Sequence, residues 1–262
     1  MADIDSSLYL FTREVKKHFT VALSGECADE IFGGYPWFRR EEDLNSNTFP
    51  WSKSLEMRRN FLSEEFKELP LEAYVNQRYK KTLGEMPDVL EGETSREKRI
   101  KELFFLNLKW FMVTLLTRKD RMSMANSLEV RVPFADHRLV EYAWNIPWEM
   151  KFHNNIEKGL LREALKGIVP EKIRMRRKSP YPKTHNPHYT EMVKEWLKMI
   201  ISDSTSPILE LVDKQRVGNL IKGNLNTVDK PWFGQLMREP QLMAYFIQLN
   251  IWLEEYDVRI IP

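Results

Sequence analysis

The sequence predicts a mainly α-helical protein with few strands. Apolar residues recur at helical spacing in most segments, only residues 19–23 form a convincing β-branched and apolar strand, and no internal repeat or low-complexity linker interrupts the 262 residues. A single strand cannot satisfy its own backbone groups. It must therefore pair with a strand elsewhere in this chain or in a portion outside it.

The first elements form a helix, a strand and a second helix in succession. Residues 3–18 predict a helix with a regular apolar face, made by Ile4, Leu8, Phe11 and Val15. The strand follows directly. Turn chemistry then precedes a second helical pattern, which begins at Glu26 and contains an apolar pair, Ile31 and Phe32.

Helices account for most of the remaining chain. Residues 41–53 are polar and predict a surface loop. Residues 94–116 become apolar nearly all round, which is typical of a central buried helix. Residues 127–134 alternate as an extended segment does and end near a proline. Further helices are expected at residues 55–62, 71–83, 136–144, 156–165, 192–201, 208–221 and 241–256.

The turn at Ser24-Gly25 and the acids after it form the most specific candidate site. A strand that feeds a helix directs unpartnered first-turn amides at one point, which favours an anion such as phosphate. Glu26, Asp29 and Glu30 follow at spacings that place three carboxylates on one helical face. These acids either complement the helix dipole in solvent or share a divalent metal with a bound phosphate, and three together favour the metal.

Two basic segments compete with this turn for a functional role. Residues 117–124 place Arg118, Lys119 and Arg121 around Asp120 at the end of an apolar helix, where charges need partners or a ligand. The simpler interpretation is a helix end whose cations complement the dipole. Residues 174–178 form the densest basic run, and such a run is more often solvated surface than a site. The aromatic and proline residues that follow favour a loop that holds its last lysine in place.

Composition excludes several classes of function. Forty Lys and Arg balance 38 Asp and Glu, and the net charge of +2 gives no general reason to expect nucleic acid or an anionic membrane as a partner. The single cysteine, Cys27, excludes an internal disulfide and suits the reducing cytoplasm. No membrane span or secretory signal is visible, and the 5 histidines lack the spacing of a zinc site. Asn186-Pro187-His188 could form a catalytic group, but its proline-rich surroundings favour the interpretation as turn chemistry.

Three segments resemble landmarks of the glutamine-hydrolysing asparagine synthetases. The first is Ser-Gly-Glu-Cys-Ala-Asp-Glu-Ile-Phe-Gly-Gly-Tyr at residues 24–35. The second is Arg-Lys-Asp-Arg-Met-Ser-Met-Ala at residues 118–125 with Leu-Glu-Val-Arg-Val-Pro-Phe at residues 128–134. The third is Glu-Lys-Gly-Leu-Leu-Arg at residues 157–162 with Arg-Lys-Ser-Pro at residues 177–180. The three occur in the family's order across most of the chain.

The resemblance implies a fold and a reaction. Residues 1–262 are expected to be the C-terminal portion of an α/β ATP-pyrophosphatase synthetase domain, which is adenine nucleotide alpha hydrolase-like. Members of this family are ATP-dependent carbon–nitrogen ligases that use ATP and Mg²⁺ to adenylate the side chain of aspartate, releasing pyrophosphate. Ammonia from glutamine then attacks the β-aspartyl-AMP, so the expected partners are small-molecule substrates.

Roles also follow from the resemblance, position by position. Four residues match nucleotide-binding positions, namely Ser24, Gly25, Glu30 and Arg121. Asp29 matches the residue on Mg²⁺ and pyrophosphate. Three residues match catalytic positions: Glu26 as the acid that forms or resolves the intermediate, Lys178 as the cation that neutralises the leaving pyrophosphate, and Arg118 as a residue that assists substrate or phosphate binding.

The chain departs from the family in two places. Residue 2 is Ala2, where family enzymes carry a nucleophilic cysteine at the start of a glutaminase domain, and the pyrophosphatase loop Ser-Gly-Gly-x-Asp-Ser is missing. We therefore expect a fragment with half an ATP site that is inactive alone, and possible homodimerisation. The alternatives are a related amide-forming ligase, such as a β-lactam synthetase-like enzyme, and a non-catalytic partner subunit.

Overall fold

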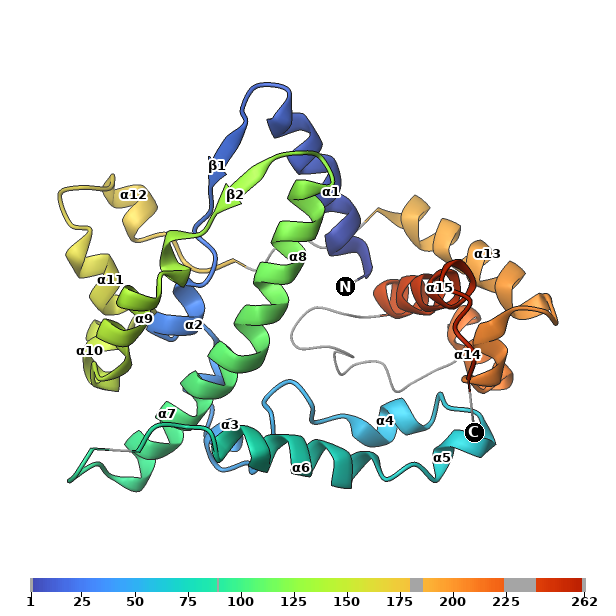
Figure 1. The fold of residues 1–262 in the computed structure, drawn as a ribbon, viewed down its shortest axis with the longest axis horizontal. Coiled ribbons are helices and arrows are strands. Elements are labelled where there is room, and N and C mark those ends of the chain that lie inside the picture. Colours follow the sequence, from blue (N-terminus) through green and yellow to red (C-terminus); the bar gives the residue numbers. More distant parts are fainter. Residues whose placement is uncertain (1, 89, 180–185, 224–238, 261–262) are drawn as a thin grey trace. The chain divides into compact units, whose positions relative to one another are not determined.

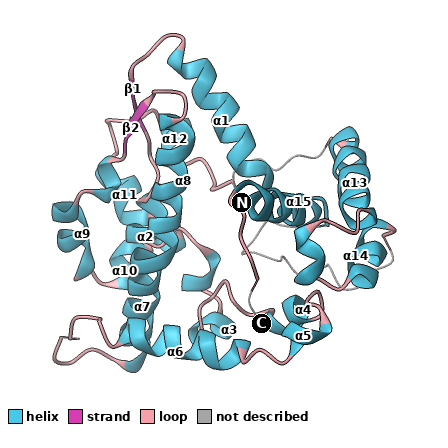
Figure 2. Cartoon of the chain, turned by 45° about the vertical axis from the view of Figure 1, so that its right-hand side comes forward, coloured by secondary structure: helices cyan, strands magenta, loops and turns pink. Residues whose placement is uncertain are grey.

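The computed structural model describes residues 2–88, 90–179, 186–223 and 239–260. The chain separates into two compact units (Figure 1). Unit 1 consists of Met1–Ser6, Trp51–Asn76 and Tyr181–Pro262, and unit 2 consists of Ser7–Pro50 and Gln77–Pro180. Helices dominate both, as the apolar periodicity predicts (Figure 2).

The predicted strand has its partner within this chain. Strand β1 (Val21–Leu23) runs parallel to β2 (Glu129–Arg131), which lies in the segment predicted to be extended. Val21 faces Glu129 across the pair. Figures 1 and 2 show the two strands side by side in unit 2, where β2 follows the end of helix α8 (Val113–Met124).

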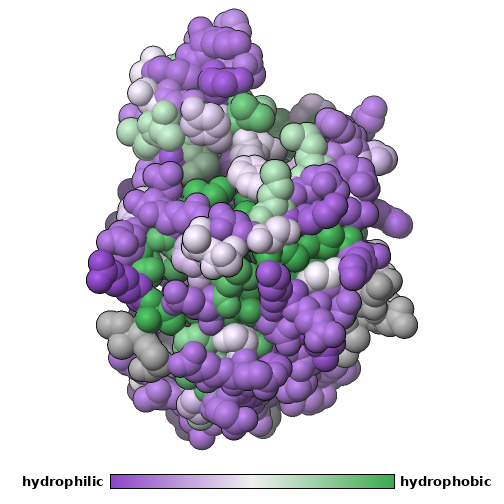
Figure 3. Space-filling model, turned by 90° about the vertical axis from the view of Figure 1, so that its right-hand side faces the viewer, coloured by the Kyte–Doolittle hydropathy of each residue, from purple (hydrophilic) through white to green (hydrophobic). Residues whose placement is uncertain are grey.

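The two strands leave apolar side chains uncovered. The exposed fractions are 63% for Phe19, 40% for Val21 and 76% for Leu23. Parallel sheets are normally covered on both faces, so this pair has the character of part of a larger sheet. Apolar residues also reach the surface elsewhere, and Figure 3 shows green patches among the purple on one face of the molecule.

Helices precede and follow strand β1 along the chain. Helix α1 (Ala2–Lys16) precedes β1, and α2 (Ala28–Phe32) follows it. The predicted apolar pair Ile31 and Phe32 is buried and packs with Ala143 of α9 (His137–Trp144). The other helical elements of unit 2 are η1 (Pro36–Phe38), α3 (Glu41–Leu44), η3 (Pro133–Ala135), α10 (Trp148–Lys151), η4 (His153–Asn155), α11 (Gly159–Ala164) and α12 (Glu171–Arg174). Helix α6 (Leu71–Leu83) begins in unit 1 and enters unit 2 after Asn76.

The long helical region differs from its prediction in one respect. Helix α7 (Ser95–Leu106) begins with a capping box at Thr94 and buries Leu103 and Leu106, but a π-helical segment, η2 (Asn107–Met112), separates it from α8. Such a segment changes the phase of the helix. Residues beyond it turn towards solvent, and Val113 is 53% exposed, so only the first part is a buried helix.

The prediction of a surface loop at residues 41–53 is wrong in part, because residues 45–53 are irregular as expected but the segment is not exposed throughout. The segment starts as helix α3, and Leu44 and Phe49 are buried. Arg99 of α7 compensates its polar backbone by donating hydrogen bonds to the carbonyl oxygens of Leu44, at 3.1 Å, and Ser46, at 2.6 Å. An arginine on a distant helix thus holds the backbone of this segment, and local composition does not reveal that contact.

Unit 1 is built around one apolar core. Leu197, Val217 and Leu242 are among its buried residues. The Asn186 side chain caps α13 by accepting a hydrogen bond from the amide of His188 at 3.0 Å, which confirms the interpretation as turn chemistry. The helical elements are α4 (Leu55–Arg59), α5 (Glu64–Lys67), α13 (Pro187–Ser202), η5 (Pro207–Glu210), α14 (Lys214–Ile221) and α15 (Glu239–Glu255). Within the described ranges, no helix combines the length and hydropathy needed to cross a bilayer.

Candidate functional site

The acidic turn has a different backbone from the one predicted. Helix α2 begins at Ala28, and Cys27 before it adopts a left-handed conformation with φ of 72°. Glu26 therefore precedes the helix, and the prediction that three acids share one helical face is wrong. The left-handed residue is the reason, because it breaks the helical path between Glu26 and Asp29 and directs their carboxylates to different partners.

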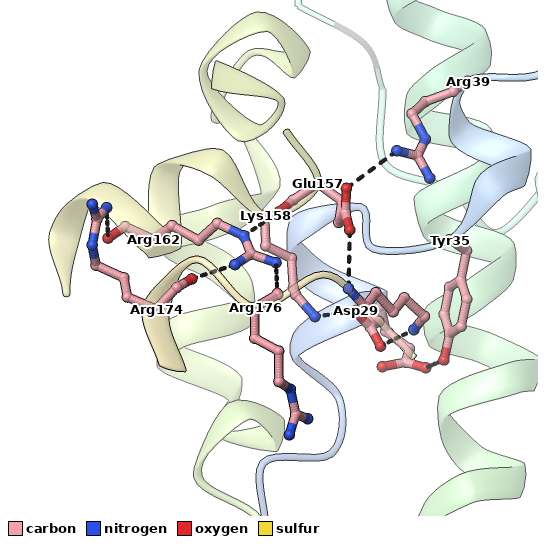
Figure 4. Close-up of polar contacts among 10 residues, drawn as sticks. Asp29, Tyr35, Arg39, Glu157, Lys158, Arg162, Arg174 and Arg176 are labelled. Atoms are coloured by element: carbon pink, nitrogen blue, oxygen red, sulfur yellow. Dashed lines mark hydrogen bonds and ion pairs between the residues drawn. The ribbon is translucent and has the colours of Figure 1, made fainter. Parts of the chain in front are cut away.

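Asp29 lies between two lysines that are distant in sequence (Figure 4). Its Oδ1 accepts a hydrogen bond from Lys158 Nζ at 2.5 Å, and its Oδ2 accepts one from Lys178 Nζ. Burial opposes ionisation of the Asp29 carboxyl, but the two ammonium charges outweigh burial and lower its pKa. A side chain at Gly34 would collide with Asp29, so this glycine makes room for the carboxylate.

Lys158 is a site residue that was not assigned a role from the sequence. It adopts a left-handed conformation with φ of 56° immediately before helix α11. A side chain at Gly159 would collide with the backbone of His153, so the chain makes a tight turn there. The signal available in the sequence was the Lys-Gly pair at the start of a predicted helix, within the third resembling segment.

Glu30 forms a buried pair with Tyr35. The Tyr35 hydroxyl donates to Glu30 Oε1, and the other carboxylate oxygen has no hydrogen-bond partner in the described part of the chain. Burial raises the pKa of Glu30 to about 7, although the hydroxyl bond opposes this, and burial also raises the pKa of Tyr35. Lys178 Nζ lies 4.4 Å from the centre of the Tyr35 ring. Glu30 therefore holds the tyrosine ring against which Lys178 lies. A contact between Glu30 and a nucleotide stays a prediction.

Replacing Glu30 by glutamine should remove a loss of stability between pH 5 and 8. A carboxyl whose pKa is raised on folding stabilises the fold below its ordinary pKa of 4.5, and this stability is lost as the pH rises through about 7. Across pH 5 to 8 the unmodified chain should lose about 2–3 kcal/mol more unfolding free energy than the variant, which keeps an acceptor for Tyr35. Denaturant titrations at both pH values measure this.

The matched control for that titration is Glu129→Gln, at an exposed carboxylate paired with Arg131. This control should follow the unmodified chain at both pH values. Equal losses of stability in the unmodified chain and in Glu30→Gln would contradict a raised pKa at Glu30.

Glu26 faces a second pair of cations. Its Oε1 lies 3.5 Å from Lys119 Nζ and 3.8 Å from an Arg118 guanidinium nitrogen, and all three side chains are largely buried. Its Oε2 is buried without a hydrogen-bond partner among the described residues. Arg121 lies on helix α8 with Arg118 and Lys119, and its side chain is exposed. Within the described chain, no polar contact joins this side chain to Glu26 or Asp29.

The turn between strand and helix is the open part of the site. The Ser24 amide donates to the carbonyl oxygen of Arg131 at 2.9 Å, which extends the strand pairing. Ser24 Oγ accepts a hydrogen bond from the Glu26 amide at 3.3 Å. Gly25 is exposed, and a side chain there would meet open space. Ser24 and Gly25 thus lie beside Glu26 with backbone accessible from solvent, as a nucleotide contact requires.

The charges suit phosphate better than a metal ion. Arg118, Lys119, Lys158 and Lys178 outnumber the two carboxyl groups that they face, those of Glu26 and Asp29. A cationic excess of this kind favours an anion such as phosphate. Both Asp29 oxygens already accept hydrogen bonds from ammonium groups, and the described residues contain no cluster of three or more His, Cys, Asp or Glu that could hold a metal. Binding of Mg²⁺ by Asp29 stays a prediction.

Comparisons with known proteins agree with the three resembling segments. Residues 1–254 match the family model described as asparagine synthase. The chain is 57% identical over 261 residues to glutamine-hydrolysing asparagine synthetase 3 of Bacillus subtilis, covering 99% of the chain and 42% of that protein. It is 32% identical over 228 residues to synthetase 1 of the same organism, covering 75% of the chain and 36% of that protein.

A mammalian relative also matches about three quarters of the chain. The human glutamine-hydrolysing asparagine synthetase is 32% identical over 198 residues, which cover 74% of the chain and 25% of that protein. The chain thus spans less than half the length of these curated relatives. Because the family model covers nearly all of its residues, the chain belongs to the asparagine synthase family.

Proposed function

We propose that this chain supplies part of the ATP site of a glutamine-dependent asparagine synthetase. The observation that carries the proposal is the pair of lysines on Asp29, because both ammonium groups come from segments resembling the family's third landmark and converge on an acid of the first. In this proposal the lysines bind phosphate oxygens of ATP. Asp29 keeps their charges together when no phosphate is present.

The proposed chemistry is adenylation of the aspartate side chain. Charge develops on phosphoryl oxygens as pyrophosphate leaves, and fixed cations in a partly buried site stabilise that charge. Lys178 and Lys158 take this role, while Glu26 and Arg118 face the reacting carboxylate. A Mg²⁺ ion bound together with the phosphates would neutralise further charge.

The uncovered strand pair supports a further part of the proposal, which is that other residues of a synthetase cover these strands. Its exposed apolar residues, with Leu23 76% exposed, suit coverage by further parts of a synthetase domain. We propose that residues of the synthetase that this chain does not match complete the sheet and contribute the missing phosphate loop. The chain alone then holds half a site and makes no asparagine.

Complementation tests this proposal. The purified chain should form no asparagine from aspartate, ATP and ammonia, whereas mixing it with the part of the Bacillus subtilis relative that it does not match should restore product formation. The same mixture made with Lys178→Gln is the control and should stay inactive. Asparagine formed by the chain alone would contradict the half-site, and an active Lys178→Gln mixture would contradict the proposed role of the lysines.

A further inference from the structure

We infer that Arg162, together with Glu157, is the positioning device that holds Lys178 on Asp29. The inference rests on the proposed function only in so far as Lys178 is taken to act on phosphate. Lys178 lies after helix α12 in a run whose residues Met175, Arg176 and Arg177 are exposed. Such a run has little apolar contact of its own, so the position of its lysine depends on polar contacts to the backbone.

The Arg162 guanidinium binds three carbonyl oxygens, one from its own segment and two from the segment before Lys178 (Figure 4). Its Nε donates to the carbonyl of Glu157 at 2.9 Å, one terminal nitrogen donates to the carbonyl of Arg174, and the other donates to the carbonyl of Arg176 at 3.0 Å. Arg174 returns a bond to the carbonyl of Arg162 at 3.1 Å. Arg162 therefore fixes the backbone both where helix α12 ends and two residues before Lys178.

Glu157 holds the chain at Lys178 itself. Its Oε1 accepts a hydrogen bond from the Lys178 amide at 3.3 Å, and its Oε2 faces Arg39 at 3.5 Å. Burial opposes ionisation of Glu157, but backbone hydrogen bonds, that from Lys178 included, and the nearby cations outweigh it and lower the pKa. The carboxylate is thus ionised at neutral pH and anchors the residue whose ammonium reaches Asp29.

One short segment therefore organises both cations. Residues 157–162 carry Lys158, which binds Asp29 directly, and the two residues that hold the backbone of Lys178. A lysine at position 162 would keep the charge, but a single ammonium cannot reach three carbonyls that a planar guanidinium reaches together. The device depends on the fork geometry of arginine and not on its charge.

The first test measures the loop without any ligand. Trypsin should cleave the bonds after Arg174, Arg176 and Arg177 at least about 10-fold faster in Arg162→Gln and in Arg162→Lys than in the unmodified chain, because lost carbonyl bonds make local opening easier. Arg138→Gln, at an exposed arginine paired with Asp136, is the matched control and should leave cleavage unchanged. Circular dichroism confirms that each variant is folded. Unchanged cleavage in both Arg162 variants would overturn the inference.

The second test asks whether Arg162 acts through Lys178. Pyrophosphate binding to the complemented synthetase, measured by calorimetry, should weaken by about 10-fold in Arg162→Gln and by at least as much in Lys178→Gln. The double variant should bind no more weakly than Lys178→Gln alone. Additive losses would overturn the positioning role, since Arg162 would then act independently. If Lys178→Gln leaves binding unchanged, the proposed function fails, and the cleavage rates still decide whether Arg162 holds the loop.

Discussion

Replacing Lys178 by alanine should lower ATP–pyrophosphate exchange in the complemented synthetase by about 100-fold or more. The ammonium group is fixed by Asp29 and lies against the Tyr35 ring, so its charge is held in place before phosphate arrives. Removing such a preorganised charge raises the barrier for a step in which charge develops on pyrophosphate. Exchange of labelled pyrophosphate into ATP measures this step without requiring ammonia.

The matched control is Lys172→Ala, at an exposed lysine on α12 outside the contacts with Asp29. The control should retain exchange. Normal exchange in Lys178→Ala would remove this lysine from the site, whereas equal losses in both variants would point to damage of the loop as a whole.

Replacing Glu26 by glutamine should abolish asparagine formation to about 1% or less while glutamine hydrolysis by the full synthetase continues. The change keeps the shape of the side chain but removes the charge that faces Arg118 and Lys119. Its Oε2 is buried and lacks a hydrogen-bond partner among the described residues, so the two cations do not satisfy the whole carboxyl group. Parallel assays of asparagine and of glutamate formation separate the two reactions.

The control for this variant is Glu129→Gln, in which an exposed ion pair with Arg131 is changed in the same way. Both reactions should continue there. An equal loss of the two reactions in Glu26→Gln would refute the assignment of Glu26 to the synthetase reaction.

The local sequence pattern was enough to predict many of the helices. The helix at residues 71–83 matches its predicted bounds, and the helix after Asp136 begins where its capping residue indicates. These elements depend on side-chain periodicity and on hydrogen bonds within a few residues, which a sequence displays directly. The contacts that hold residues 44–46 were not predictable in this way, since they come from Arg99, which lies about 50 residues further along the chain.

Some features of the candidate site could likewise be predicted from the sequence, and others could not. The family, and Glu26, Asp29, Arg118 and Lys178 as candidate site residues, can be predicted from residue types at fixed spacing, which carry a resemblance without a structure. The folded chain was needed to see that β1 pairs with β2, and that Lys158 shares Asp29 with Lys178. It likewise placed Arg162 on the backbone of the Lys178 loop. Local spacing does not specify these contacts, because ion pairs and hydrogen bonds to carbonyl groups between distant segments depend on how the turns bring the backbone together.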